Sequence, residues 1–120
     1  RDKLPKFNNG RTDTQKGKMI FNWFEWKRDN SKEYSKIHPT QKPVGLLKRL
    51  IEIFTDEGDV VIDPVAGSAS TLRACAELNR NGYGFEIKKE FYKKAKEKMI
   101  SEDILNGILE DGQVTFESIL

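Results

Sequence analysis

The stretch VVIDPVAGSAS, residues 60–70, decides the fold of this 120-residue chain. Its first three residues are apolar on both faces, which is typical of a central strand in a parallel sheet. A turn containing Gly67 follows, then a helical pattern over residues 70–79 and a second apolar stretch over residues 83–87. We therefore predict two parallel strands joined by a helix in a right-handed crossover. The inner face of that helix is predicted to contain Leu72, Cys75, Ala76 and Asn79.

Other helices and strands are expected around this unit. Apolar residues recur at helical spacing after Pro43, and Gly58 is placed to end that helix. Its apolar stripe is predicted to consist of Val44, Leu47, Leu50, Ile51 and Phe54. Ser68 or Ser70 is the expected cap of the helix over residues 70–79. The remaining predictions are a helix over residues 88–100 and, in the ambiguous last twenty residues, one or two helical turns over 104–109 and an edge strand over 114–116.

The N-terminal part of the chain has a different character. Residues 1–18 are polar, with the turn signal NNG, and are expected to form a loop or a disordered lead-in. Residues 18–26, KMIFNWFEW, are rich in aromatic side chains and predict a strand that is covered on both sides. Trp23 and Trp26 either pack in the core, which we favour, or stack on nucleic-acid bases.

Charge is distributed unevenly along the sequence. Residues 1–50 carry 13 Lys and Arg against 5 Asp and Glu, whereas residues 51–120 carry 8 against 14. A basic half attracts a phosphate backbone, so we favour DNA as a partner; a solvated lysine-rich surface is the alternative. We predict a basic lead-in with an aromatic strand over residues 1–36 and an α/β domain over residues 37–120.

Composition sets further bounds. A hydrophobic content of 37% with 33% charged residues is polar for a self-sufficient globule, which favours a fragment or a domain that needs a partner. Cys75 is the single cysteine, so neither an intramolecular disulfide nor a metal cluster is expected. No apolar run approaches the ~20 residues that span a membrane. We expect a cytoplasmic protein without a membrane partner.

Three motifs follow one another in the sequence. They are HPTQKP at residues 38–43, a D-P-x-x-G-S-x-[ST] turn at residues 63–70 and the strand end GFE at residues 84–86. Together they resemble the amino-group DNA methyltransferases, which use S-adenosylmethionine to methylate the exocyclic amine of adenine or cytosine. The resemblance covers residues 36–100. It implies a partial Rossmann-like methyltransferase fold, with a parallel sheet core flanked by helices, and S-adenosyl-L-methionine as the cofactor.

The residues around the glycine turn suit a nucleoside without phosphates. A dinucleotide site needs G-x-G-x-x-G, whereas this turn has one glycine, Gly67, which leaves room for the cofactor. Asp63, at a strand end, is predicted to accept from the ammonium of the methionine tail, or else to be a turn carboxylate. Glu86 is predicted to accept from both ribose hydroxyls, or else to face surface lysines. Ile87 contacts the adenine ring or belongs to the core.

The resemblance adds the HPTQKP segment to this site. In the family the segment lies over the methionine end of the cofactor, and its prolines keep such a loop preorganised. His38, the single histidine, is assigned a structural role. The predicted cofactor-binding residues, expected to meet at one cleft, are Thr40, Gln41, Lys42, Asp63, Pro64, Gly67, Ser68, Glu86 and Ile87.

Two departures from the family pattern matter. Relatives usually carry a glycine where Ala69 stands; if φ is positive there, we expect the alanine to weaken cofactor binding. No D-P-P-Y loop occurs, so no catalytic residue is predicted. In one large subgroup of the family that loop precedes the cofactor-binding half. We therefore interpret the chain as the C-terminal, cofactor-binding half of such an enzyme, with the end of its target-recognition region in residues 1–36.

The preferred function is accordingly a part of a restriction–modification DNA methyltransferase from a bacterium, phage or prophage, inactive without its catalytic half. The alternative is a non-catalytic DNA-binding or scaffolding module derived from a methyltransferase half. A Rossmann-type enzyme with another nucleotide is disfavoured by the single glycine and the HPTQKP motif. Expected partners are double-stranded DNA, the missing catalytic half and a second copy of the chain, because an uncovered sheet edge favours self-association.

Overall fold

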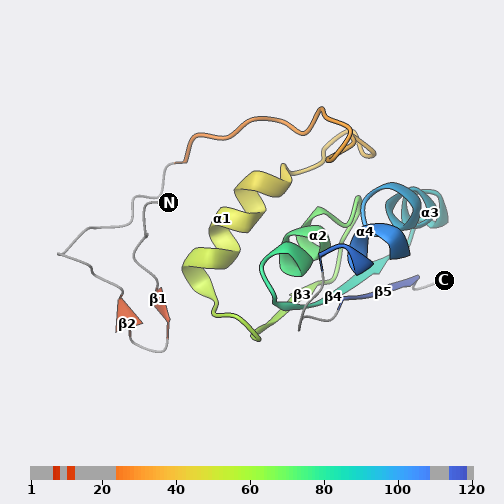
Figure 1. Cartoon of the computed structure of the whole chain (residues 1–120). Helices are drawn as coiled ribbons and strands as arrows, with labels where there is room; N and C mark the ends of the chain where they lie inside the picture. Colours follow the sequence, from red (N-terminus) through yellow and green to blue (C-terminus); the bar gives the residue numbers. More distant parts are fainter. Residues whose placement is uncertain (1–6, 9–10, 13–23, 109–113, 119–120) are drawn as a thin grey trace.

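The computed structural model describes residues 7–8, 11–12, 24–108 and 114–118 of the chain (Figure 1). Its helices are α1 (Val44–Phe54), α2 (Ser70–Glu77), α3 (Lys89–Lys98) and α4 (Glu102–Asn106). Its strands are β1 (Phe7–Asn8), β2 (Arg11–Thr12), β3 (Val60–Asp63), β4 (Asn81–Glu86) and β5 (Val114–Ser118). The helices predicted after Pro43 and over residues 88–100, and the strand predicted at 114–116, are confirmed within a few residues.

The main sheet has the order β3-β4-β5, and both of its pairings are parallel. Val60 aligns with Asn81 and Asp63 with Gly84, so the predicted parallel pairing of the two apolar stretches is confirmed. α2 connects them. Because parallel strands run in the same direction, their carboxyl ends meet at one edge of the sheet. Asp63 and Glu86 therefore end neighbouring strands at that edge.

One face of the sheet is packed very closely against α2. Gly82 and Gly84 are buried in β4, and a Cβ added at Gly84 would lie 2.7 Å from Leu72 Cδ1. At Gly82 the added atom would lie 3.0 Å from Cys75 Cβ. Burial raises the pKa of the Cys75 thiol to about 12, since the charged thiolate is disfavoured there. The two glycines let helix and strand approach closely, which forms the centre of the core.

The opposite face of the sheet is open. Figure 1 shows α2, α3 and α4 above the sheet in that view and α1 to its left, and the described residues include no helix below the sheet. Val60 is 57% exposed and Ile62 is 65% exposed. β3 pairs only with β4 among the described residues, so it lies at an edge. The prediction that residues 60–62 form a central strand covered on both faces is therefore wrong for this chain.

Four local predictions about α1 and α2 are also wrong. α1 ends at Phe54, which is exposed rather than in the apolar stripe, while Gly58 stands in a later turn with φ of +84°. Asn79 lies beyond the end of α2 in the left-handed region, with φ of +56°. Ser68 and Ser70 bond each other through their hydroxyls (2.8 Å) and neither caps the helix. These differences arise at helix ends, where turn hydrogen bonds override periodicity.

The lead-in contains less regular structure than the aromatic pattern predicts. Residues 24–26 are not in a strand, and Trp26 is 51% exposed, so its predicted role in the core is wrong. The part of the predicted strand over residues 18–23, Trp23 included, lies outside the described residues. β1 and β2 pair antiparallel and join Asn8 to Arg11, where a loop was expected, and β1 contacts α1.

Residues 29–35 are held to the α/β unit by hydrogen bonds that cross the predicted boundary at residue 36. The Asp29 carboxylate accepts from the Val44 N–H, with its two oxygens at 3.2 and 3.3 Å. Pro43 precedes α1, and its ring has no acceptor atom for the N–H groups of the first helical turn. Asp29, fifteen residues earlier in the chain, thus provides the hydrogen-bond acceptor for an N–H group that has no partner within the helix. Its negative charge is also favourable at the positive end of the helix dipole.

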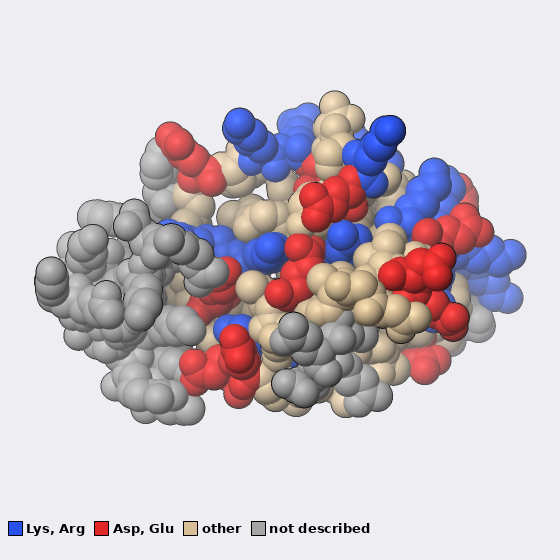
Figure 2. All heavy atoms as spheres, viewed as in Figure 1, with Lys and Arg blue, Asp and Glu red and all other residues tan. Residues whose placement is uncertain are grey.

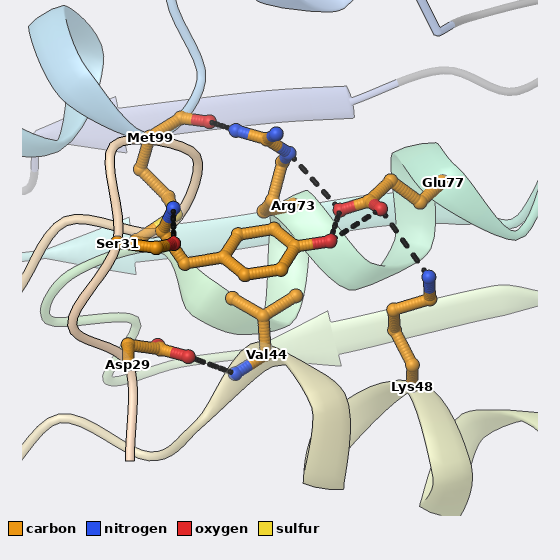
Figure 3. Close-up of polar contacts among 8 residues, drawn as sticks. Asp29, Ser31, Val44, Lys48, Arg73, Glu77 and Met99 are labelled. Atoms are coloured by element: carbon orange, nitrogen blue, oxygen red, sulfur yellow. Dashed lines mark hydrogen bonds and ion pairs between the residues drawn. The ribbon is translucent and has the colours of Figure 1, made fainter. Parts of the chain in front are cut away.

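Glu77, at the end of α2, is the centre of a network that joins four parts of the chain (Figure 3). Its carboxylate accepts from Tyr34 Oη at 2.7 Å, from Arg73 Nε at 3.0 Å and from Lys48 Nζ at 3.3 Å. Arg73 also donates to the Met99 carbonyl at 3.0 Å, and its guanidinium stacks over the Tyr34 ring. The lead-in, α1, α2 and the end of α3 are therefore tied together around one carboxylate.

This network predicts a loss of stability at high pH. Burial and the hydrogen bond to Glu77 raise the pKa of Tyr34 above its ordinary value, which is about 10. The neutral phenol therefore contributes stability that is fully present below pH ~10 and is lost as the pH rises further. Urea unfolding of the wild type and of Tyr34→Phe between pH 8 and 11 should show the wild type losing its advantage above pH ~10. Parallel profiles for the two proteins would contradict this role.

Candidate cofactor site at the carboxyl edge of the sheet

The turn after β3 is shaped by backbone conformation. Gly67 has φ of +54°, in the left-handed region that favours glycine. The Ala66 N–H donates to the Phe85 carbonyl at 2.8 Å, which fixes the turn against β4. Asp63 Oδ1 accepts from the Val65 N–H at 3.1 Å. A Cβ added at Gly67 would meet only His38, at 3.9 Å, so the glycine is required here for its conformation more than for space.

Glu86 holds the turn to the end of β4. Its Oε2 accepts from the Gly67 N–H at 2.8 Å, and its Oε1 accepts from the Lys88 N–H at 3.0 Å. The side chain is buried, so the expected alternative of a surface glutamate facing lysines does not apply. An ionised carboxylate has about four acceptor positions, and the two backbone donors occupy about half of them. Glu86 can thus accept further hydrogen bonds at the sheet edge.

The HPTQKP segment lies against this turn through His38. The His38 ring packs on the Phe91 ring with centroids 4.2 Å apart and is the nearest neighbour of the Gly67 position. His38 Nδ1 accepts from the Thr40 N–H at 3.2 Å, which places the proton of a neutral ring on Nε2. These contacts support the structural role assigned to His38.

Gln41 is committed to the segment itself. Its Oε1 accepts from the Ile37 N–H at 2.8 Å, and its Nε2 donates to Asp29 Oδ2 at 2.8 Å and to the Ser35 carbonyl at 3.0 Å. Thr40 and Lys42, on either side of it, are both exposed. Gln41 therefore shapes the loop, while its two neighbours present their side chains to solvent.

Ala69 has φ of +62° and ψ of +23°, in the left-handed region, and precedes α2. Its methyl group is fully buried in the core and is not on the exposed side of the turn. The unfavourable backbone conformation costs roughly 1–2 kcal/mol. The positive φ meets the condition under which the alanine is expected to weaken cofactor binding. Because the methyl group is buried, the expected cause is strain within the turn.

Replacing Ala69 by glycine should change the free energy of unfolding by less than about 1 kcal/mol. Relief of the strained φ is offset by the loss of a buried methyl, about 0.8 kcal/mol, and by greater freedom of the unfolded chain, about 0.4–1 kcal/mol. Ala69→Val should cost about 3 kcal/mol, because it adds volume at a fully buried site and places a β-branched residue at positive φ. Thermal and urea unfolding measure both; a large gain from glycine would mean that strain dominates the turn.

The structure brings some of the predicted site residues together at the sheet edge and buries another below the surface. Gly67 and Glu86 are joined directly, and Asp63 ends the neighbouring strand. Ile87 is 52% exposed directly after Glu86, which disfavours its alternative assignment to the core. Pro64 is exposed, whereas Ser68 is buried and bonded to Ser70.

Several contacts that shape the site and its supports could not be predicted from the sequence. Asp29 as a distant helix cap, the Tyr34–Glu77 hydrogen bond and the His38–Phe91 contact all join residues far apart in the chain. Only the proximity of Arg73 and Glu77 at helical i,i+4 spacing could have been recognised. No group of three His, Cys, Asp and Glu side chains that could hold a metal occurs among the described residues. Within the same residues, no helix is long and apolar enough to cross a membrane.

Comparison with known proteins is consistent with this geometry. A family model described as DNA methylase matches residues 2–97. The chain is 48% identical over 67 residues to the Type II methyltransferase M.HpaI of Haemophilus parainfluenzae, which is 56% of this chain and 21% of that protein. It is 32% identical over 96 residues to the Type II methyltransferase M2.LlaDCHI of Lactococcus lactis subsp. cremoris, covering 80% and 34%.

Solved structures show the same fold. The crystal structure of an M1.HpyAVI–SAM complex matches with a TM-score of 0.52 and 36% identity, over 72% of this chain and 46% of that one. A putative DNA modification methylase of Thermus thermophilus, complexed with S-adenosyl-L-methionine, matches with a TM-score of 0.51 and 32% identity, over 66% and 31%. This chain thus spans between about a fifth and a half of the length of these proteins. With the family model covering most of its residues, the chain belongs to the DNA methylase family.

Proposed function

We propose that the chain is the cofactor-binding part of a DNA methyltransferase that transfers a methyl group from S-adenosylmethionine to the exocyclic amine of adenine or cytosine. The observation that carries this proposal is the 2.8 Å hydrogen bond between the Gly67 N–H and Glu86 Oε2. It joins the glycine turn after one parallel strand to the carboxylate that ends the next. Ligands of open α/β sheets bind at this edge.

Glu86 and Ile87 would hold the adenosine. The acceptor positions that Glu86 retains suit the paired hydroxyls of a ribose, and each charge-assisted hydrogen bond contributes roughly 1.5–3 kcal/mol. The exposed Ile87 side chain offers an apolar surface for the adenine ring next to it. A carboxylate that accepts from the ribose hydroxyls, beside an apolar side chain that contacts the base, fits a nucleoside without phosphates.

Asp63, Thr40 and Lys42 would hold the methionine tail. Asp63 uses one oxygen for the Val65 N–H and retains acceptor positions for an ammonium group. Thr40 and Lys42 are accessible on the segment that His38 anchors near Gly67. Gln41 acts indirectly, by holding that segment in shape. The bound cofactor supplies the electrophilic methyl group, and these residues orient it.

The catalytic loop and most of the DNA-recognition surface are proposed to come from residues outside this sequence. The chain covers 21–34% of the two curated relatives described above, which leaves length for both. Extrusion of the target base and acceptance of its amine protons would occur there. Such a protein would work in the cytoplasm, where the DNA is.

Equilibrium dialysis with labelled S-adenosylmethionine tests the proposal. We expect saturable binding of one molecule per chain, displaced by S-adenosylhomocysteine and not by ATP, because the turn lacks a phosphate-binding glycine pattern. A folded chain that binds no cofactor at millimolar concentration would contradict the proposal. That result would favour the non-catalytic module instead.

We further propose that the open sheet face binds polypeptide, in the isolated chain a second copy. Val60 and Ile62 are exposed on β3, whose outer edge has no strand partner among the described residues. Unpaired edges next to apolar surface favour association, and two β3 strands could pair across a two-fold axis. In the complete enzyme the same surface would meet the catalytic half.

Sedimentation measures this association directly. We expect a species of twice 13.8 kDa at tens of micromolar. Ile62→Lys should shift the equilibrium to monomer, whereas Glu97→Lys on the exposed side of α3 should not. A wild-type monomer at every concentration would contradict self-association.

A further inference from the structure

Asp29 of the lead-in bonds the HPTQKP segment and α1 at the same time. Its Oδ2 accepts from Gln41 Nε2 at 2.8 Å, and its two oxygens lie 3.2 and 3.3 Å from the Val44 N. Figure 3 shows the carboxylate pointing at the start of α1. Because α1 begins directly after the segment, one carboxylate holds the segment both from within and at its end.

Asp29 also determines how the Gln41 amide is oriented. An ionised carboxylate only accepts hydrogen bonds, so the amide must turn its NH₂ group toward it. The amide oxygen then faces the Ile37 N–H, from which it accepts at 2.8 Å, and Nε2 donates as well to the Ser35 carbonyl at 3.0 Å. Gln41 therefore closes residues 35–41 into a loop whose shape depends on Asp29.

Asp29 is an acidic residue in a basic part of the surface. Figure 2 shows Lys and Arg side chains along the upper edge of that view, where Figure 1 draws residues 24–42. None of the ion pairs formed by the described residues involves Asp29. Its carboxylate is directed instead at uncharged N–H donors, and such charge-assisted hydrogen bonds are roughly twice as strong as those between neutral groups.

We propose that Asp29 is a positioning residue for the methionine end of the cofactor. Through Gln41 it holds the loop that presents Thr40 and Lys42, the two exposed residues assigned to that end. A binding group is precise only when further hydrogen bonds fix the element that carries it. The inference rests on the proposed function for the identity of the cofactor, and it makes the lead-in a part of the cofactor site.

The nucleoside end of the site has separate supports. Glu86, which is assigned to the ribose, bonds the N–H groups of Gly67 and Lys88. Asp29 should therefore affect binding of the methionine tail and leave binding of the nucleoside unchanged.

Calorimetric titration with two ligands tests this difference. S-adenosylmethionine has the tail, whereas 5′-methylthioadenosine has the nucleoside without it. Asp29→Ala should weaken binding of the first about tenfold and of the second less than about twofold, because only the loop at the tail loses its hydrogen bond. Asp29→Asn keeps the shape and one acceptor oxygen, so it should recover part of the loss. It repeats the comparison if Asp29→Ala does not fold.

Thr55→Val is the matched control for stability. It removes the hydrogen bonds of the Thr55 hydroxyl with the Ile51 carbonyl (2.6 Å) and with Arg80 Nε (2.9 Å) at the opposite end of α1. The variant should unfold more easily than the wild type and bind both ligands with unchanged affinity.

A double-mutant cycle shows whether Asp29 acts through Gln41. In a Gln41→Ala background, Asp29→Ala should weaken S-adenosylmethionine binding by less than about a further twofold, because the contact is already lost. A second readout needs no cofactor. In the ¹⁵N spectrum of the free chain, Asp29→Asn should shift the side-chain NH₂ signals of Gln41.

Four results would overturn the proposal. They are unchanged S-adenosylmethionine affinity of Asp29→Ala, an equal loss for both ligands, a loss in Thr55→Val as large as in Asp29→Ala, and additive effects in the cycle. Each of them leaves the proposed function intact, provided that the wild type binds S-adenosylmethionine. A folded wild-type chain that binds neither ligand would overturn the proposed function, and this inference with it.

Discussion

Replacing Glu77 by alanine is expected to lower the free energy of unfolding by about 3 kcal/mol. The carboxylate accepts from Tyr34, Arg73 and Lys48, and its removal leaves the buried Arg73 guanidinium without its anionic partner. Losing one partner of a buried ion pair typically costs about 3–5 kcal/mol; the exposure of Lys48 places this case at the lower end. Urea unfolding followed by circular dichroism measures the loss.

Two variants make this expectation specific to the network. Glu77→Gln keeps the shape of the side chain and one acceptor oxygen, so its free energy of unfolding should fall less than that of the alanine variant. Glu90→Ala breaks the exposed pair with Lys94, which should be worth less than about 0.5 kcal/mol. Equal effects of Glu77→Ala and Glu90→Ala would show that the network contributes no more than a surface pair. A small chain has a stability of only about 5–15 kcal/mol, so the expected difference is easily resolved.

Replacing Glu86 by alanine is expected to weaken S-adenosylmethionine binding by about a hundredfold or more. Two hydrogen bonds to a charged acceptor contribute roughly 1.5–3 kcal/mol each, and the turn at Gly67 also loses the acceptor that holds its N–H. Glu86→Gln should be intermediate, because its amide retains one acceptor oxygen. Calorimetric titration gives the affinities.

Stability must be measured in parallel, since the Gly67 and Lys88 N–H groups lose their partner in the alanine variant. Glu97→Ala, which removes an exposed carboxylate from α3, is the control for a change of charge alone. A folded Glu86→Ala protein with unchanged cofactor affinity would remove Glu86 from the site.

The sheet and its carboxyl edge could be predicted from the sequence because the signals are local. A short apolar run, a glycine turn and a helix predict parallel pairing, and the motif at residues 63–70 places Asp63 and Gly67 at the end of the first strand. The second strand then brings Glu86 to the same edge. Because the strands are parallel, their carboxyl ends lie at the same edge of the sheet whatever conformation the connecting loops adopt.

What could not be predicted depends on partners distant in sequence. Trp26 belongs to an aromatic run whose pattern predicts a strand covered on both sides. Among the described residues, Trp26 is in no strand and its side chain is half exposed. Val60 and Ile62 read as central-strand residues for the same reason. Both predictions assumed cover that the described residues do not supply, because an apolar pattern in a sequence does not identify the surface that would cover it.

The most direct test of the cofactor site is a titration of the ¹⁵N-labelled chain with S-adenosylmethionine, followed by two-dimensional NMR. We expect saturable shifts of the backbone amide signals of Gly67, Ser68, Glu86, Ile87 and Lys88. Signals from the exposed side of α3 should stay in place. Shifts confined to other regions, or no shifts at millimolar cofactor in a folded sample, would contradict this expectation.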